Sequence, residues 1–230
     1  MKKIIELEDR IKYTFKKKDY LVRALTHKSY LFESDDLDKD NQRLEFLGDA
    51  VLEFLVSVFL FKKYPDAREG ELTKMRSSMI ANSALVKIAE SIDLGDYLFL
   101  GRGEDNQQGR GRASSLGDAL EALIAAVYLD SDFETAGNVF LYIGKSLFEN
   151  IEKLQLSQNP KGTLQELLQG KYGILPEYKV ISVQGPEHAP SYKVALFVDG
   201  KECAEAIAGT KKEAEMKAAF IGLENYKNDI

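Results

Sequence analysis

The chain has 230 residues, 44% of them hydrophobic and 30% charged, which is typical of a soluble globular protein with one large or two modest domains. Its formal net charge of −6 argues against a protein that coats nucleic acid non-specifically, although a local basic patch is compatible with that total. No apolar run predicts a membrane span, the N-terminus lacks the apolar core of a signal sequence, and a single cysteine excludes an intramolecular disulfide. We therefore expect a cytoplasmic protein.

Residues 1–153 are predicted to form an all-α domain. Apolar residues recur there at helical spacing, without the alternation of apolar and polar residues that indicates strands. A polar, Gly-rich loop over residues 104–115 contains two arginines that could contact phosphate, and an ordinary surface loop is an equally good interpretation. The predicted helices cover residues 6–13, 19–25, 42–61, 69–88, 118–129 and 133–154.

A second domain is predicted over residues 161–228, after a polar linker at 154–160 that ends in proline. Its periodicity predicts the order α-β-β-β-α, with a tight turn at Asp199-Gly200 between the last two strands. The fold class is therefore multidomain: an all-α domain followed by a small α+β domain. The predicted elements of the second domain are helices over 163–171 and 210–226 and strands over 178–183, 192–198 and 202–208.

Two acidic residues stand out in the apolar helix predicted over residues 42–61. Glu45 and Asp49 are spaced i and i+4, so their carboxylates lie on one helical face about one turn apart. Two like charges at this distance repel each other, and burial of an unpaired carboxylate is costly. Either the pair reaches solvent at the rim of an ordinary helix, or a cation compensates it.

A second helix repeats this pattern. Asp118 and Glu121 are spaced i and i+3 and again lead into an apolar helix. Two such helices could bring four carboxylates together, and oxygen ligands of this kind are what Mg²⁺ prefers. The sequence therefore favours a metal site.

The ordered set of motifs in the chain resembles that of the ribonuclease III family. Residues 43–52 (Arg-Leu-Glu-Phe-Leu-Gly-Asp-Ala-Val-Leu) resemble the signature helix of that family, and residues 118–130 resemble its second acidic helix. Residues 160–226 are similar to a double-stranded RNA-binding domain. Shorter stretches support the match in the same order: Leu25-Thr26-His27-Lys28-Ser29-Tyr30, Glu69-Gly70 and Gly101-Arg102-Gly103-Glu104.

The resemblance implies an endoribonuclease that hydrolyses double-stranded RNA with Mg²⁺, for which Mn²⁺ would substitute, and that uses no nucleotide cofactor. It implies products with 5′-phosphate and 3′-hydroxyl ends and short 3′ overhangs, a homodimer, and processing of ribosomal RNA precursors, messenger RNA and other structured RNAs. By motif, Glu45, Asp118 and Glu121 would ligate metal, and Asp49 and Glu121 would be catalytic. Glu69 and Gln42 would have supporting roles.

The chain departs from the family pattern at Gln42, where a glutamate is usual. Gln42 keeps the hydrogen-bonding shape on the same helical face without the charge, so any metal or water contact that depends on an anion there is in doubt. It is the one feature that favours an alternative reading, a dimer that binds double-stranded RNA without cutting. A carboxylate-bridged di-iron bundle needs Glu-x-x-His pairs, and neither His27 nor His188 has a Glu three residues earlier.

For the second domain, the resemblance places Gln165, Glu166 and His188 against successive minor grooves of A-form RNA and Lys211 and Lys212 against phosphate. From Pro160 onward the sequence has nine Lys and ten Asp or Glu, a net charge of −1, so binding must depend on a local patch and should be sensitive to salt. In the first domain, apolar residues after Asp49 exceed what one small domain can cover, which favours a twofold interface.

Overall fold

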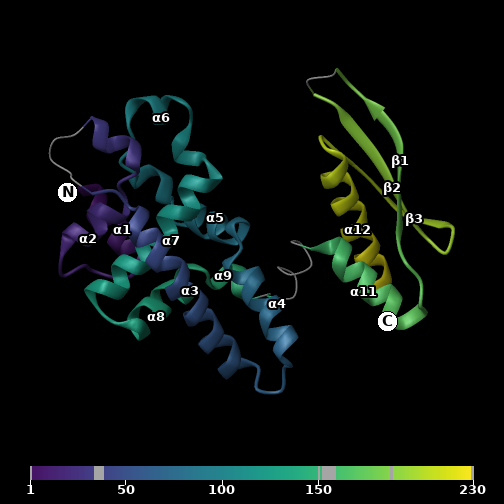
Figure 1. Ribbon diagram of the computed structural model, residues 1–230, viewed down its shortest axis with the longest axis horizontal. Coiled ribbons are helices and arrows are strands. Elements are labelled where there is room, and N and C mark those ends of the chain that lie inside the picture. The colour runs from purple at the N-terminus through teal and green to yellow at the C-terminus, as the bar shows by residue number, and fades with distance from the viewer. Residues whose placement is uncertain (1, 34–38, 150, 152–158, 187–188, 229–230) are drawn as a thin grey trace. The chain divides into compact units, whose positions relative to one another are not determined.

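The computed structural model describes residues 2–33, 39–149, 151, 159–186 and 189–228. They fall into two compact units, Met1–Ile151 and Glu152–Ile230. Figure 1 shows that the first is helical throughout and that the second combines two helices with a sheet. The predicted fold class, an all-α domain followed by an α-β-β-β-α domain, is confirmed. No helix among the described residues is both long and apolar enough to span a membrane.

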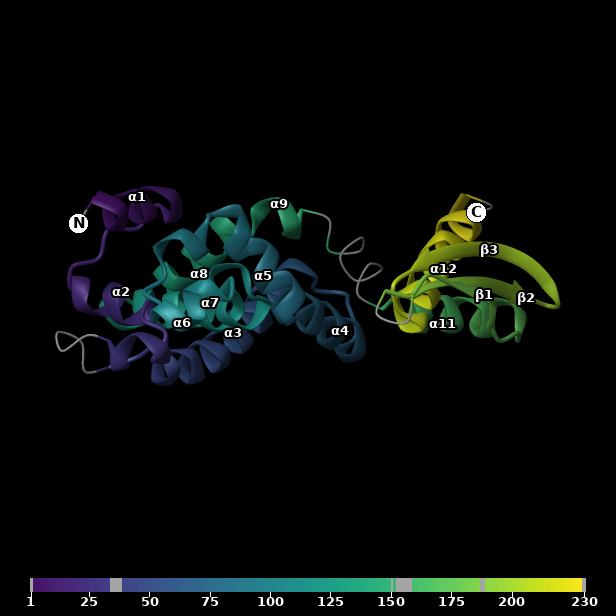
Figure 2. The same ribbon diagram turned by 90° about the horizontal axis from the view of Figure 1, so that it is seen from above.

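The first unit is built around one buried helix, α7 (Ala113–Asp130). Between Ser115 and Val127, only Asp118 and Glu121 are not fully buried. The helices α2 (Lys18–Ala24), α3 (Gln42–Lys63), α5 (Asn82–Ser91) and α8 (Phe133–Ile143) pack against it, as Figures 1 and 2 show. The remaining elements are α1 (Lys2–Ile11), η1 (Lys28–Phe32), α4 (Glu69–Ile80), η2 (Leu94–Tyr97), α6 (Arg102–Asn106), η3 (Gly109–Gly111) and α9 (Lys145–Phe148).

The backbones of α3 and α7 approach closely at Gly48. A Cβ atom placed on Gly48 would lie 2.1 Å from the carbonyl oxygen of Glu121. No side chain is compatible with that distance, so glycine is what allows the two backbones to touch. The contact sets the early turns of α3, with Glu45 and Asp49, beside the middle of α7.

The single helix predicted over residues 69–88 is divided in the structure. α4 and α5 meet at Ala81, whose ψ of 141° lies outside the helical region. The carbonyl oxygen of Ala81 accepts hydrogen bonds from the amides of Ala84 (2.7 Å) and Leu85 (3.0 Å), so a new helix begins there. Apolar residues keep helical spacing on both sides of the break, which is why the periodicity does not reveal it.

Residues 104–115, predicted to be a loop, contain the end of α6, the short helix η3 and the start of α7. Arg110 donates hydrogen bonds to the carbonyl oxygens of Leu98 (2.8 Å) and Gly95 (3.1 Å) and forms an ion pair with Asp105 (2.7 Å). Arg112 forms an ion pair with Glu104. Internal contacts therefore hold both arginines, which favours the structural interpretation of this stretch.

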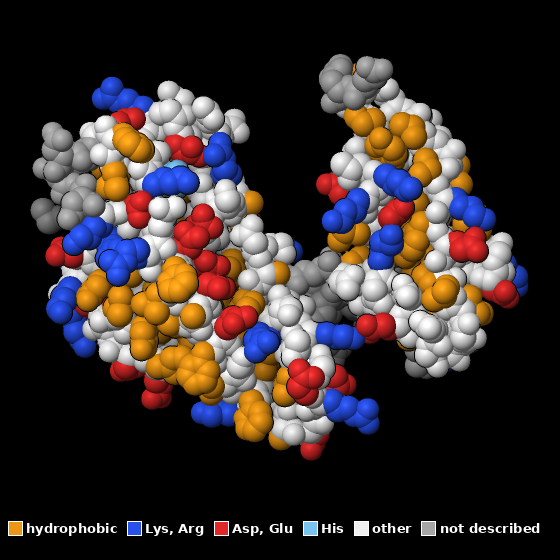
Figure 3. Space-filling view, in the orientation of Figure 1, with side chains coloured by type: hydrophobic (Ala, Val, Ile, Leu, Met, Phe, Trp, Pro, Cys, Tyr) orange, Lys and Arg blue, Asp and Glu red, His pale blue; other side chains and the backbone are white. Residues whose placement is uncertain are grey.

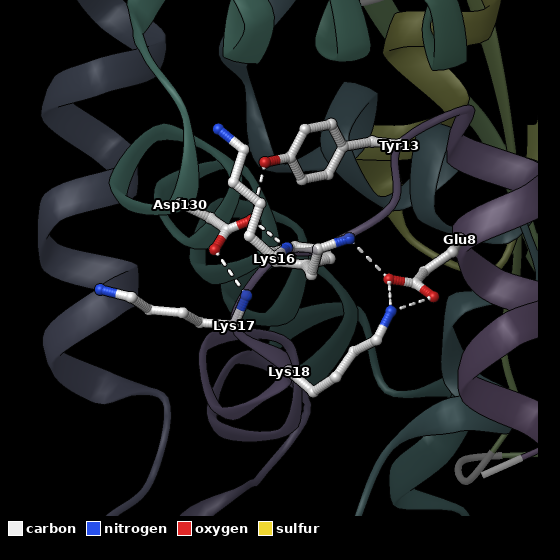
Figure 4. Close-up of polar contacts among 7 residues, drawn as sticks. Glu8, Tyr13, Lys16, Lys17, Lys18 and Asp130 are labelled. Carbon is white, nitrogen blue, oxygen red and sulfur yellow. Dashed lines mark hydrogen bonds and ion pairs between the residues drawn. The ribbon is translucent and has the colours of Figure 1, made fainter.

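Two carboxylates anchor the connection between α1 and α2, as Figure 4 shows. Asp130, at the end of α7, accepts hydrogen bonds from the Tyr13 hydroxyl (2.7 Å) and from the amides of Lys16 (2.7 Å) and Lys17 (2.9 Å). Burial opposes ionisation of Asp130, but these three donors outweigh it and lower its pKa. Glu8 accepts from the Phe15 amide at 2.7 Å. Asp130, the last residue of α7, therefore stabilises the connection between α1 and α2.

We expect Asp130→Ala to destabilise the first unit by about 3 kcal/mol, because it leaves two backbone amides and a hydroxyl without their acceptor. Calorimetric unfolding of the full chain measures the effect. Asp9→Ala, which removes an exposed acid from α1, serves as the control and should change stability by less than about 0.5 kcal/mol. Equal unfolding of the two variants would contradict the anchoring role.

The second unit is a three-stranded antiparallel sheet with two helices on one face. The strands β1 (Glu177–Gln184), β2 (Ser191–Val198) and β3 (Lys201–Ala208) lie in the order β1-β2-β3. The predicted turn at Asp199-Gly200 is confirmed: both residues have positive φ (51° and 72°), as the favoured two-residue hairpin turn requires. The helices α11 (Pro160–Tyr172) and α12 (Lys211–Asn228) cover the sheet with a core of Leu164, Leu168, Leu196, Val198, Ala218, Ala219 and Leu223.

Candidate active site

Four carboxylates gather where α3 crosses α7. Glu45 and Asp49 come from α3, and Asp118 and Glu121 come from α7 opposite. The glycine contact at residue 48 fixes the spacing of the two backbones, and the i,i+4 and i,i+3 spacings turn each pair toward the other helix. In Figure 3, acidic side chains form a band on this unit beside a field of hydrophobic ones.

The electrostatics of Glu121 show how closely these groups interact. Burial is the largest influence on its pKa, and the negative charge of Asp49 is the next. With the further charges of Asp118 and Glu45, the pKa rises to about 7 from an ordinary value of 4.5. Near neutral pH, ionisation of Glu121 is therefore opposed by the other three acids, and a cation would relieve that cost.

The pKa values of two other members are raised as well. Burial, and then the charge of Asp118, raise the pKa of Glu45, while Lys28 opposes the shift. Burial also raises the pKa of Asp118, against the opposing influence of His27 and Lys28. Crowded carboxylates with raised pKa values on rigid helices are typical of functional sites.

The donor set suits a hard divalent cation. It consists of carboxylate oxygens, the ligands that Mg²⁺ takes, and it carries more negative charge than the neighbouring cations offset. Within the described residues, no three His, Cys, Asp or Glu side chains already converge on one point as metal ligands do. The chemistry and backbone placement of the four acids fit a metal.

His27 and Lys28 reach the site from the start of η1. The backbone amide of His27 donates to the Phe99 carbonyl (3.0 Å), and the backbone amide of Asn41 donates to the Thr26 carbonyl (2.9 Å), so residues 26 and 27 are held beside the start of α3. The Nδ1 atom of His27 lies 2.8 Å from the Ser29 hydroxyl, a structural contact within η1. The sequence motif contains Lys28 but does not reveal that it faces acids on two separate helices.

The two supporting residues named from the sequence are both exposed at the start of a helix. Gln42 is exposed at the first position of α3, and its backbone amide donates to Asp40 Oδ1 (3.1 Å). Glu69 is exposed at the start of α4, where it accepts a hydrogen bond from the Thr73 hydroxyl (2.9 Å). It borders a groove of about 500 Å³ between α3 and α4, with Phe61 and Arg76 among the lining residues.

In the second unit, the residues expected to contact RNA are on two helices. Gln165 and Glu166 are exposed on the second turn of α11, and Lys211 and Lys212 are exposed at the first turn of α12. His188 lies outside the described residues.

Comparison with known proteins gives the same division of the chain. Residues 17–147 match the family model Ribonuclease-III-like, and residues 160–226 match the Double-stranded RNA binding motif. Ribonuclease 3 of Campylobacter jejuni subsp. doylei is 43% identical over 224 residues, covering 97% of each chain. Ribonuclease 3 of Sulfurovum sp. is 41% identical over 222 residues, covering 96% of this chain and 97% of the relative.

A solved structure is similar to the first unit. The crystal structure of the nuclease domain of ribonuclease III from Campylobacter jejuni is 41% identical, with a TM-score of 0.59, and the match covers 64% of this chain and 97% of that one. A second structure of the same domain, 40% identical with a TM-score of 0.58, was described for flexibility in its region of dimer formation. The chain therefore belongs to the ribonuclease III family of endoribonucleases specific for double-stranded RNA.

Proposed function

We propose that this chain hydrolyses phosphodiester bonds of double-stranded RNA at the four-carboxylate cluster, with Mg²⁺ as the working cation and Mn²⁺ as a substitute. The observation that carries the proposal is the placement of four acids on facing turns of α3 and α7, with the pKa of Glu121 raised to about 7. Ribonuclease III enzymes are generally metal-dependent. Products would have 5′-phosphate and 3′-hydroxyl ends with short 3′ overhangs, and the substrates would be ribosomal RNA precursors, messenger RNAs and other structured RNAs in the cytoplasm.

The four acids divide the work. Glu45, Asp118 and Glu121 would hold the cation, which when bound would lower the pKa of an attacking water and stabilise the leaving oxygen. Asp49, the most exposed of the four, would orient that water by accepting a hydrogen bond from it. Glu121 must be ionised for its part, which links activity to pH near 7.

Lys28 would have a separate task. It already faces Glu45 and Asp118, and its charge favours their ionised forms. Because its ammonium group is positively charged and only donates hydrogen bonds, it would also attract the phosphate of the RNA toward the acids. Gln42 and Glu69 would act from the edge of the site as supporting residues.

The test of this function is cleavage of a labelled RNA duplex of about 35 base pairs. We expect cuts in both strands with Mg²⁺, no cutting with Ca²⁺, and no cutting of a single strand of the same sequence. Enzymatic end analysis of the products then identifies the 5′-phosphate. Binding of the duplex without any cutting in Mg²⁺ would support the alternative, a protein that binds double-stranded RNA without cleaving it.

We also propose that the first unit forms a homodimer through α3. Three large aromatic side chains on this one helix are exposed: Phe46 (82%), Phe54 (59%) and Phe61 (72%). Exposed aromatic groups gathered on one element are typical of an interface, and Figure 3 shows a broad hydrophobic field on this unit. A twofold dimer would present one carboxylate cluster from each subunit to the two strands of a duplex.

We expect Phe46→Ser to shift the protein from dimer toward monomer, with at least a tenfold higher dissociation constant of the dimer, because the most exposed aromatic side chain of α3 is lost from the proposed interface. Sedimentation velocity over a range of concentrations measures this. Phe32→Ser is the matched control, since Phe32 is 90% exposed but lies on η1. A dimer that survives Phe46→Ser and dissociates with Phe32→Ser would place the interface elsewhere.

A further inference from the structure

One partly buried acid joins the two helices of the second unit that are expected to contact RNA. Glu215, on α12, accepts from the Nζ atom of Lys161 at 2.6 Å. The Nζ atom of Lys211, one turn earlier on the same helix, lies 3.8 Å from the other carboxylate oxygen. The side chain of Glu215 is only 15% exposed, whereas those of Lys161 and Lys211 are 39% and 61% exposed. Glu215 thus lies beneath two cations that reach solvent.

Lys161 has a second restraint. Its Nζ atom lies 4.5 Å from the centroid of the Tyr178 ring, on β1, in cation–π geometry. Burial and the nearby charge of Glu215 raise the pKa of Tyr178 to about 12, so this ring stays neutral. The ammonium group is therefore held from two sides, by Glu215 and by the ring, while the rest of it stays open to solvent.

The position of Glu215 is electrostatically unfavourable for binding an anionic ligand such as RNA. The unit has nine Lys against ten Asp or Glu from Pro160 onward, and an acid next to phosphate-binding lysines should weaken RNA binding further. In Figure 3, cationic side chains surround an acidic one over α12. A compensating benefit is available: a lysine already fixed in its binding position loses less side-chain freedom when it meets a phosphate.

We propose that Glu215 is a positioning residue for RNA binding. It holds Lys161, from the first turn of α11, and Lys211, from the first turn of α12, as one preformed pair of phosphate-binding cations. Lys161 is then an RNA contact in addition to Lys211 and Lys212. This inference rests on the proposal that the second unit binds double-stranded RNA through the first turns of its two helices.

The experiment measures binding of the full chain to a 25-base-pair RNA duplex with Ca²⁺ in place of Mg²⁺. Glu215→Ala should weaken binding about five- to tenfold at 0.15 M salt, although it removes a negative charge. Lys161→Ala should weaken binding similarly and reduce the slope of log affinity against log salt by about 1. The double variant should bind like Lys161→Ala alone, since the acid acts through the lysine.

Two further variants make the result decisive. Glu224→Ala removes an exposed acid from the last turns of α12 and should leave binding unchanged or slightly tighter. Glu215→Gln keeps the hydrogen-bonding shape and should give an intermediate loss, which covers the case in which Glu215→Ala unfolds the unit. Unchanged or tighter binding by folded Glu215→Ala or Glu215→Gln would overturn the inference. Failure of the wild type to bind the duplex would instead overturn the proposed function.

Discussion

Glu121→Gln is expected to reduce cleavage of an RNA duplex at least 10³-fold while binding of the duplex persists. The substitution keeps the size of the side chain and removes the carboxylate whose pKa is raised by the charges of the other three acids. In the proposed site Glu121 ligates the cation that acts on the reacting groups, so its loss should affect the chemical step, and single-turnover cleavage in Mg²⁺ is the appropriate measurement. Glu134→Gln, an exposed acid on α8, is the control and should cleave like the wild type.

The same variant should be more stable than the wild type when no metal is present. Glu121 has a pKa of about 7 in the folded protein against an ordinary 4.5, so the folded state binds the extra proton between these values. The folding stability of the wild type therefore falls as pH rises from about 5 to 7, and above pH 7 the loss of stability linked to ionisation of Glu121 is complete. Glu121→Gln has no such group, so its unfolding temperature in EDTA should not show this loss. A less stable Glu121→Gln protein at pH 8 would contradict this account.

Gly48→Ala is expected to destabilise the first unit by at least about 3 kcal/mol and to reduce cleavage as well. The new Cβ atom would lie 2.1 Å from the carbonyl oxygen of Glu121, so α3 and α7 would have to separate. Separation would also pull the acids of the two helices apart. Calorimetric unfolding and single-turnover cleavage measure the two effects.

Gly70→Ala provides the matched control, since a Cβ atom at Gly70 of helix α4 would meet nothing within 4 Å. Alanine there should leave stability unchanged or raise it by about 0.5–1 kcal/mol, because alanine favours the helix more than glycine does. If Gly48→Ala were as well tolerated as Gly70→Ala, close backbone contact would not be what sets the spacing of the site.

Much of the first unit could be predicted because local pattern and tertiary position agree. The i,i+4 and i,i+3 spacings of the acids determine which side chains share a helical face, and the apolar runs around them indicate burial. That the two faces meet depends on the backbone contact at Gly48, which spacing alone does not reveal. The break at Ala81 escaped prediction because the apolar spacing continues across it.

Contacts between residues far apart in the sequence were the main part that could not be predicted. Lys28 begins η1, and the place of η1 beside α3 depends on hydrogen bonds that the preceding residues, 26 and 27, make with Phe99 and Asn41. Single-sequence periodicity carries no such information. The pair of Lys161 and Glu215 joins residues 54 positions apart. The sequence identifies Lys211 and Lys212 as cations at a helix start, but it does not show the partly buried acid, Glu215, beneath Lys211.

The most direct test of the carboxylate site is a calorimetric titration of Mg²⁺ into the wild type and Glu121→Gln at pH 8, repeated for the wild type at pH 6. We expect Glu121→Gln to bind Mg²⁺ at least tenfold more weakly than the wild type. We also expect the wild type to lose about tenfold in Mg²⁺ affinity at pH 6, where Glu121 is mostly protonated. Equal Mg²⁺ affinity of the wild type and Glu121→Gln, with no change between the two pH values, would contradict a metal site built from these four acids.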